Sequence, residues 1–362
     1  MSKYIGFIGA SGVGKTTIIG RILEELNFIS EDLRKEAVEE AKMLGERYHY
    51  RLYIDEGLQE KRGKLTEELK LIKIPQWHAY LVDIPGKLSR IDHLSTALMF
   101  LDTAIIVGNY ESFNQKADYY KATLTLAKKL KIKTICINIS DKHKAIPDYV
   151  EANVEKCIAT NIENVKEIVD TISNSLKVQS SRPTGKDRLI MPILKVIGEI
   201  GILETIPIKG LLESGMEVIV NPILKIGYIN TIEHYGQVYK KIGREYVAVT
   251  LRKVGRQFIK RGYVITDSLH IPPRVGVVRV NLLYQDKRIS EKRRVIICIG
   301  SMKTSASVKH VGNMEIELTL DEPLTATLFD EEDILGFALL TDYRRILGAG
   351  IIADIKVPKV LS

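Results

Sequence analysis

The sequence has few cysteines, few aromatic residues and no long uninterrupted apolar run. Three cysteines in 362 residues are too few for a disulfide framework and too scattered for a metal cluster. The most apolar stretch, residues 189–208, contains Lys195, Glu199 and Glu204, which are costly at a bilayer centre, so we expect strands there. The first residues lack the apolar core and cleavage site of a signal peptide. These absences predict a protein of the reducing cytoplasm without a membrane partner.

The charged residues are nearly balanced in one half of the chain and unbalanced in the other. The chain has 53 Lys and Arg against 45 Asp and Glu, a net charge of +8. Residues 1–181 carry 26 basic and 25 acidic side chains, so residues 182–362 carry +7. Between Lys240 and Arg294, fifteen basic residues face four acidic ones. This region is a candidate RNA site, although a solvated surface of interspersed basic residues gives the same composition.

Strands and helices alternate in residues 1–181. Apolar, β-branched segments predict strands at residues 4–9, 69–74, 79–82, 103–107 and 134–139. Apolar residues at helical spacing predict helices at residues 14–26, 115–130 and 164–175. A further helix carries His93, which we expect on its surface. The alternation predicts an α/β domain with a mostly parallel sheet and helices on both faces.

Residues 182–362 show a different pattern of short alternating strands separated by glycine turns. Such a pattern is typical of small closed β structures, because a barrel removes exposed strand edges. The consecutive prolines of Ile271-Pro272-Pro273 favour an extended connection between two units. We therefore predict three domains, at residues 1–181, 182–270 and 271–362, of which the last two are small all-β barrels.

Residues 9–16, with the sequence GASGVGKT, fit the pattern G-x-x-x-x-G-K-[ST] between the first strand and the first helix. In this pattern backbone N–H groups converge on phosphate oxygens, the lysine neutralises the β and γ phosphates, and the last hydroxyl coordinates Mg²⁺. A glycine-rich turn with a solvated lysine is the alternative. The predicted nucleotide-binding residues here are Gly9, Ser11, Gly12, Val13, Gly14, Lys15, Thr16 and Thr17.

A second predicted part of the site is Asp83-Ile84-Pro85-Gly86, at the end of the apolar strand 79–82. A carboxylate at position 83 can hold the Mg²⁺ shell through water, and the N–H of Gly86 can contact the γ phosphate. Taken alone, Asp-x-Pro-Gly is also a good turn sequence. Its position after the phosphate loop and an apolar strand favours the functional interpretation.

A third predicted part is a loop that reads the base. Asn138-Ile139-Ser140-Asp141 follows a strand, and the Asp141 carboxylate can accept hydrogen bonds from N1 and N2 of guanine. Adenine lacks that pair of donors, so Asp141 would select GTP over ATP. Asn-x-x-Asp after a strand is also a common helix cap, which is the alternative for this motif.

The order of these motifs resembles the translational GTPases, namely elongation factor 1-alpha, elongation factor Tu and SelB, over almost the whole chain. Residues 198–216, 242–262 and 342–352 are similar to segments of the family's two barrel domains. The archaeal SelB-like paralogues resemble the chain most, and no tail corresponds to the fourth domain of SelB. The resemblance implies a P-loop GTPase domain that binds GTP or GDP with Mg²⁺, uses Ala159 beside the base, and engages tRNA or the ribosome. It further implies a cytoplasmic monomer that binds no DNA.

Several residues depart from the family pattern. Lys87 occupies the position of the histidine that orients the attacking water, and losing such a group typically costs about 10² to 10⁴-fold in rate, so we expect weak or lost GTP hydrolysis. Ile139 replaces the lysine that covers the guanine ring, and Ile158-Ala159 stand for a Ser-Ala pair. In Arg62-Gly63-Lys64-Leu65-Thr66 the spacing has one extra residue, so Thr66 is either a Mg²⁺ ligand or a helix cap.

Four functions remain open at this point. The first is a GTP-binding elongation factor-like protein that engages tRNA or the ribosome with weak or lost hydrolysis. The second is an active GTPase that delivers aminoacyl-tRNA to the ribosome. The third is a P-loop kinase or ATPase of a small metabolite, and the fourth is an RNA-binding scaffold whose nucleotide site is empty.

Overall fold

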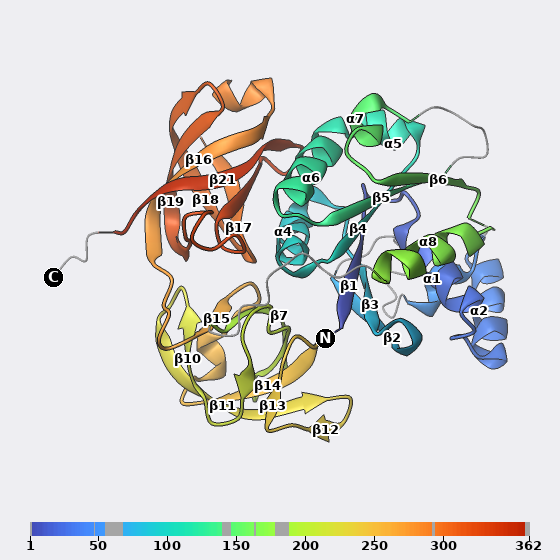
Figure 1. Ribbon diagram of the computed structural model, residues 1–362, viewed down its shortest axis with the longest axis horizontal. Coiled ribbons are helices and arrows are strands. Elements are labelled where there is room, and N and C mark those ends of the chain that lie inside the picture. Colours follow the sequence, from blue (N-terminus) through green and yellow to red (C-terminus); the bar gives the residue numbers. More distant parts are fainter. Residues whose placement is uncertain are drawn as a thin grey trace. The chain divides into compact units, whose positions relative to one another are not determined.

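A computed structural model describes residues 2–46, 48–54, 68–139, 146–162, 164–177, 188–291 and 294–358 (Figure 1). The chain divides into two compact units. One unit consists of Lys3–Leu94 and Leu101–Ser181, and the other of Met1–Ser2, Ser95–Phe100 and Arg182–Ser362.

The first unit is built on a six-stranded sheet with the strand order β2-β3-β1-β4-β5-β6. The strands are β1 (Lys3–Ile8), β2 (Lys70–Ile74), β3 (Ala79–Asp83), β4 (Thr103–Gly108), β5 (Lys133–Ile139) and β6 (Lys156–Thr160). Strand β2 pairs with β3 antiparallel, and the other neighbouring strands are parallel. The mostly parallel sheet predicted from the sequence is confirmed.

Helices cover both faces of this sheet, and Figure 1 shows α1 and α8 on one side and α6 on the other. The strand residues Ile5 and Ile105 pack in one apolar core with Ile18 of α1 and Ile168 of α8. Tyr4, which precedes Ile5 and points to the opposite face, is also fully buried. Burial on both faces explains why these strands are almost continuously apolar. The helices are α1 (Lys15–Glu25), α2 (Glu31–Met43), α4 (Ile91–Phe100), α5 (Tyr110–Gln115), α6 (Ala117–Lys129), α7 (Asp148–Glu151) and α8 (Lys166–Leu176), with 3₁₀ helices η1 (Tyr50–Tyr53), η2 (Pro75–Trp77) and η3 (Leu88–Arg90).

Four features of this unit differ from the prediction. The helix expected over residues 115–130 is two helices, α5 and α6, which are divided at Lys116. Helix α2 was not predicted, because eight of its thirteen residues are charged and it buries only the two small side chains of Ala37 and Ala41. The expectation that His93 lies on a helix surface is wrong: its exposed fraction is 4%, and every residue of α4 is buried. Strand β6 was also missed, since it lies at the sheet edge, where exposed and buried residues alternate.

The second unit contains two closed antiparallel barrels. In the first barrel the strand order is β10-β15-β7-β8-β14-β11, closed by pairing of β10 with β11. Its core contains Met191, Leu203, Val218 and Val249, among other apolar residues. The strands are β7 (Ile190–Ile197), β8 (Ile202–Thr205), β10 (Glu217–Asn221), β11 (Lys225–His234), β14 (Val247–Arg252) and β15 (Val264–Asp267), with the short strands β9 (Leu212–Glu213), β12 (Gln237–Val238) and β13 (Lys241–Ile242) and the 3₁₀ helix η4 (Arg256–Phe258).

In the second barrel the closed strand order is β16-β19-β18-β17-β20-β21. The prolines Pro272 and Pro273 lie between the last strand of the first barrel and the first strand of the second. The strands are β16 (Arg274–Gln285), β17 (Arg294–Ile299), β18 (Met302–Gly312), β19 (Glu315–Thr325), β20 (Phe337–Thr341) and β21 (Ile346–Lys356), with the 3₁₀ helix η5 (Lys287–Glu291). The prediction of two small all-β barrels after an α/β domain is confirmed.

The three cysteines are free thiols, and two of them are neighbours in space. Cys136 on β5 and Cys157 on β6 are register partners, although 21 positions separate them in sequence. Within the described residues, no helix is both long and apolar enough to cross a bilayer.

Candidate functional site

The glycine-rich loop of residues 9–14 joins the end of β1 to the start of α1. Gly12 and Gly14 have φ angles of 80° and 94°, a conformation that side chains disfavour. A methyl group on Gly9 would lie 2.2 Å from the carbonyl oxygen of Val107, so this position tolerates no side chain. The sequence thus forms a tight loop at the amino terminus of a helix, where backbone N–H groups are available to an anion.

Lys15 lies inside this loop and has an exposed fraction of 6%. Its ammonium group donates hydrogen bonds to the carbonyl oxygens of Gly9 at 2.9 Å and Ala10 at 3.1 Å. Burial lowers the pKa of Lys15 to about 8, and the nearby Asp83 carboxylate opposes part of that shift. A buried cation of this kind is stabilised by an arriving phosphate.

The predicted metal ligands Thr16 and Asp83 meet at the ends of two different elements. The hydroxyl of Thr16, in the first turn of α1, donates to Oδ2 of Asp83, at the end of β3, over 2.6 Å. The Thr16 oxygen is a hard donor that can bind Mg²⁺ directly, and the Asp83 carboxylate beside it can accept a hydrogen bond from a water on the metal. This set of oxygen groups fits Mg²⁺. Thr17 follows in the same turn and is partly buried.

Gly86 brings the second motif directly onto the loop. A methyl group on Gly86 would lie 2.4 Å from the carbonyl oxygen of Gly9 and 2.6 Å from the backbone N of Ser11. The backbone of the Asp-x-Pro-Gly turn therefore rests on the phosphate loop, which only glycine permits. Ser11 is exposed and Val13 partly buried, and Val13 packs against the core of the unit.

The base side of the site, where the structure describes it, combines the buried polar side chain of Asn138 with apolar side chains. Asn138, with an exposed fraction of 4%, ends β5, and Ala159 on β6 is its register partner. A methyl group on Gly14 would lie 3.1 Å from Cδ1 of Ile139 and 3.8 Å from Cδ1 of Ile162. The sequence analysis missed Ile162, which has a φ angle of 75°, an unusual conformation for a β-branched residue. Two isoleucines thus flank the loop next to the strand that carries Asn138.

Two predicted residues lie outside the described ranges. These are Asp141, expected to read the base, and Thr66, expected either to coordinate Mg²⁺ or to cap a helix. The remaining predicted residues, from the phosphate loop, β3 and β5, lie together at the carboxyl ends of parallel strands, where ligands bind in such sheets.

Comparison with known proteins agrees with this arrangement. The family described as "Elongation factor Tu GTP binding domain" matches residues 2–317. The chain belongs to this family of translation elongation factor-like GTPases.

The individual relatives are distant but extend over the whole chain. Elongation factor 1-alpha of Sulfurisphaera tokodaii is 22% identical and that of Sulfolobus acidocaldarius is 24% identical, in alignments that cover 98% of this chain and 97% of each relative. The GTPase-like domain of Saccharomyces cerevisiae Ski7, solved with GTP, has a TM-score of 0.73 at 12% identity and covers 98% of this chain and 97% of its own. The bacterial selenocysteine-specific elongation factor EF-Sec has a TM-score of 0.67 at 18% identity, and this chain spans 60% of its length. The structural likenesses establish a shared fold.

Tyr120 supports the phosphate loop, a role that the sequence analysis did not detect. Its hydroxyl, on α6, accepts a hydrogen bond from the N–H of Ala10 over 3.1 Å and donates one to the carbonyl oxygen of Val107 over 2.9 Å. Burial raises the pKa of this hydroxyl. In the sequence, an aromatic residue on an amphipathic helix looks like any core residue, so no signal marked it.

The basic region between Lys240 and Arg294 carries less unpaired charge than the sequence count indicates. Four of its cations make ion pairs and Arg244 has an exposed fraction of only 7%. The pairs are Lys241–Glu213 at 3.1 Å, Arg279–Glu317 at 3.4 Å, Arg288–Asp286 at 2.9 Å, and Arg294–Asp321. Glu213, Glu317 and Asp321 lie outside the window that was counted, so its net charge overestimates the local field.

Exposed cations of this region that make no ion pair within the described residues lie on both barrels. Lys240, Arg252, Lys253, Arg256 and Lys260 lie on the first barrel, and Arg274 and Lys287 lie on the second. Aromatic rings lie among the cations of the first barrel. The Lys253 ammonium is 4.8 Å from the centre of the Tyr228 ring. Lys225 similarly lies 4.7 Å from the centre of the Phe258 ring. We call Lys225, Tyr228, Arg252, Lys253, Arg256 and Phe258 the aromatic-basic surface.

Proposed function

We propose that this member of the elongation factor family binds GTP and GDP with Mg²⁺, engages tRNA or the ribosome, and hydrolyses GTP slowly or not at all. The hydrogen bond between Thr16 and Asp83, beside the buried Lys15, carries the nucleotide part of the proposal. It places one oxygen ligand, one carboxylate that can hold a metal-bound water and one cation around the space that the phosphate loop surrounds. When bound, Mg²⁺ would neutralise charge on the phosphates.

In this proposal the base is selected by Asp141 and packs against Ile139 and Ile162. Calorimetry with GTP and ATP analogues tests the selection, and we expect clearly tighter binding of the GTP analogue. Equal or tighter binding of the ATP analogue would instead support a kinase or ATPase.

Slow hydrolysis is proposed from Lys87, which follows Gly86 and immediately precedes η3. A lysine ammonium donates hydrogen bonds but has no acceptor, so it cannot orient a water as a neutral imidazole does. Single-turnover hydrolysis with and without ribosomes tests this point. We expect little stimulation by ribosomes and a faster rate in Lys87→His. A strongly ribosome-stimulated rate in the unaltered chain would favour an active GTPase that delivers aminoacyl-tRNA.

RNA binding is proposed for the aromatic-basic surface of the first barrel. Cations follow a phosphate backbone and aromatic rings accept stacked bases, so the interleaved pair of residue types suits RNA. We expect Arg252→Glu with Lys253→Glu to weaken tRNA binding strongly and to reduce its salt dependence. The control is Lys35→Glu with Lys42→Glu, which makes the same charge change on exposed positions of α2. Equal weakening by both pairs would show that net charge, rather than this surface, governs binding.

A cytoplasmic location, a monomeric state and kinship to the archaeal SelB-like paralogues belong to the same proposal. Co-purification with ribosomes or tRNA, followed by identification of the bound nucleotide, would test the translational role directly.

A further inference from the structure

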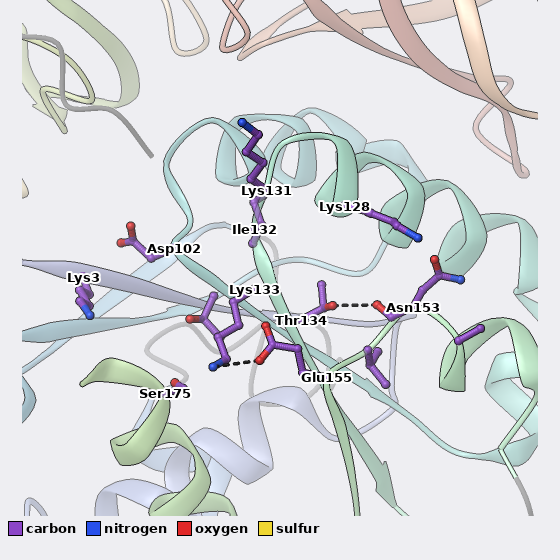
Figure 2. Close-up of a pocket in the computed structure, with 13 residues that line it drawn as sticks. Lys3, Asp102, Lys128, Lys131, Ile132, Lys133, Thr134, Asn153, Glu155 and Ser175 are labelled. Carbon is purple, nitrogen blue, oxygen red and sulfur yellow. Dashed lines mark hydrogen bonds and ion pairs between the residues drawn. The ribbon is translucent and has the colours of Figure 1, made fainter. Parts of the chain in front are cut away.

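A cavity lies at the opposite end of the parallel strands from the phosphate loop. Its volume is about 590 Å³, and it is lined by residues at the starts of β1, β4 and β5 and at the ends of α6 and α8 (Figure 2). Strand β1 begins at this cavity with Lys3 and ends at the phosphate loop. The cavity is therefore separate from the nucleotide site, although the two share a strand.

The lining of this cavity is rich in lysine. Lys3, Lys128, Lys131 and Lys133 line it together with two acidic residues, Asp102 and Glu155, which leaves two positive charges in excess. Figure 2 shows the pair between Lys133 and Glu155, whose Nζ and Oε2 atoms are 2.9 Å apart. The Lys3 ammonium donates to the carbonyl oxygen of Leu176, at the end of α8, and Asp102 accepts a hydrogen bond from the N–H of Tyr4.

Lys128 and Lys131 supply the excess. Both side chains are exposed, and neither ammonium group makes an ion pair or hydrogen bond within the described residues. Lysines at a helix carboxyl end often neutralise the last carbonyl groups. Here the backbone already does so, because the N–H groups of Leu130, Lys131 and Ile132 donate to the carbonyl oxygens of Leu126, Lys128 and Ala127 at 2.8, 3.1 and 2.8 Å. The end of α6 therefore does not account for these two cations.

We propose that this cavity binds a small anion with two or more phosphate groups. Its volume lies within the range of about 300 to 1,000 Å³ that is common for small-molecule sites. Lysine is a compact cation that suits phosphate oxygens. Because these two ammonium groups have no partner within the described residues, they lose no protein contact there when phosphate replaces their water. Lys133 and Asn153 also line the cavity, where the Lys133 ammonium pairs with Glu155 and the Asn153 amide donates to the carbonyl oxygen of Tyr149. A single-stranded RNA would instead need a continuous groove with stacking rings, and none of the described residues that line this cavity is aromatic.

The test uses the full chain with Lys15→Ala, so that the phosphate loop cannot capture the probe. Pyrophosphate is titrated by calorimetry in excess EDTA, into this variant and into the same variant with Lys128→Ala and Lys131→Ala. The control adds Lys35→Ala and Lys42→Ala, which remove two exposed lysines from α2. We expect saturable binding at one site, weakened at least tenfold by the cavity pair and less than twofold by the control pair.

Mass spectrometry after lysine acylation locates the site independently. We expect pyrophosphate to protect Lys128 and Lys131 from acylation and to leave Lys35 and Lys42 reactive. The proposal is overturned by absence of saturable binding, by equal weakening in both double variants, or by protection elsewhere. Protection by an RNA oligonucleotide but not by pyrophosphate would also overturn it, in favour of a macromolecular partner. None of these results depends on GTP binding, so they are distinct from a failure of the proposed nucleotide function.

Discussion

The two sides of the nucleotide site differ in how they are built. On the phosphate side, Lys15, Thr16 and Asp83 form hydrogen bonds to each other or to the loop, and Gly86 rests on its backbone. On the base side, the described residues nearest the loop are isoleucines at positions 139 and 162. Polar contacts with fixed geometry impose a strict requirement on each atom, whereas apolar contacts depend on shape and area. The phosphate side should therefore respond to substitution much more sharply than the base side.

The largest effect is expected from Lys15→Ala. The motif predicts that the Lys15 ammonium binds phosphate oxygens by charge-assisted hydrogen bonds, so its removal should weaken the binding of GTP and GDP by about 100-fold or more. Fluorescent nucleotide titration measures this change, with thermal unfolding to show that the variant folds. Lys35→Ala, at an exposed position of α2, is the control and should bind normally. Unchanged affinity in Lys15→Ala would indicate an RNA-binding scaffold whose loop does not hold nucleotide.

The next largest effect is a dependence of nucleotide affinity on pH. Because the pKa of Lys15 is about 8 in the free protein, the side chain loses its proton as the pH rises through 8. Bound phosphate favours the charged form, so nucleotide binding above pH 8 must take up a proton. Affinity should then fall by up to about tenfold per pH unit. Calorimetry in buffers with different ionisation enthalpies measures the uptake, and affinity that is flat from pH 7 to 9.5 would contradict it.

The lowered pKa of Lys15 also predicts how the free energy of unfolding changes with pH. Between about pH 8 and the ordinary lysine value of 10.5, the unfolded chain binds a proton at Lys15 that the folded chain has lost. This group therefore raises the free energy of unfolding as the pH rises through that window. The change should disappear in Lys15→Ala.

A smaller effect is expected from Tyr120→Phe. The substitution leaves the N–H of Ala10 and the carbonyl oxygen of Val107 without their partner, which should lower the free energy of unfolding by about 1 to 3 kcal/mol. The neighbouring Tyr119 provides a matched control, because its hydroxyl is buried without a hydrogen bond to any described residue. Tyr119→Phe should be neutral or stabilising in the same urea titration. Equal losses in both variants would mean that ring packing, and not the hydroxyl, supports the loop.

The smallest effect is expected on the base side. Ile139→Lys provides a longer stem over the base and should strengthen GTP binding only a few-fold, in line with about 0.5 to 1 kcal/mol for a cation over a ring. Ile139→Met separates the length of the stem from its charge. A change as large as that in Lys15→Ala would break the contrast between the two sides.

The sequence allowed most of the fold and the phosphate side to be predicted, because those features depend on local patterns. Lys15 and Thr16 stand at fixed positions within one short motif, and the strands that frame them are long and apolar. Helix α2 was missed because eight of its thirteen residues are charged, and its packing depends on the small surfaces of Ala37 and Ala41.

Contacts between distant segments were not predictable in this way. Ile162 reaches Gly14, and Tyr120 reaches Ala10, across more than 100 residues of sequence. Cys136 and Cys157 likewise become neighbours through the register of two parallel strands. The net positive charge counted between Lys240 and Arg294 is partly neutralised in the structure. Glu317 and Asp321, both on β19, pair with Arg279 and Arg294. All of these contacts join residues that are distant in sequence, so a pattern or a charge count taken along the sequence does not include them.

Strand β1 has a consequence for energetic linkage between its ends. Its six residues run from Lys3, at the lysine-lined cavity, to Ile8, at the phosphate loop, a length of about 20 Å for an extended chain. If occupation of the cavity alters nucleotide affinity by any factor, nucleotide must alter the affinity of the cavity by the same factor. The concentration of a small polyanion would then act on the nucleotide state, and the nucleotide state on the polyanion, through a single rigid strand.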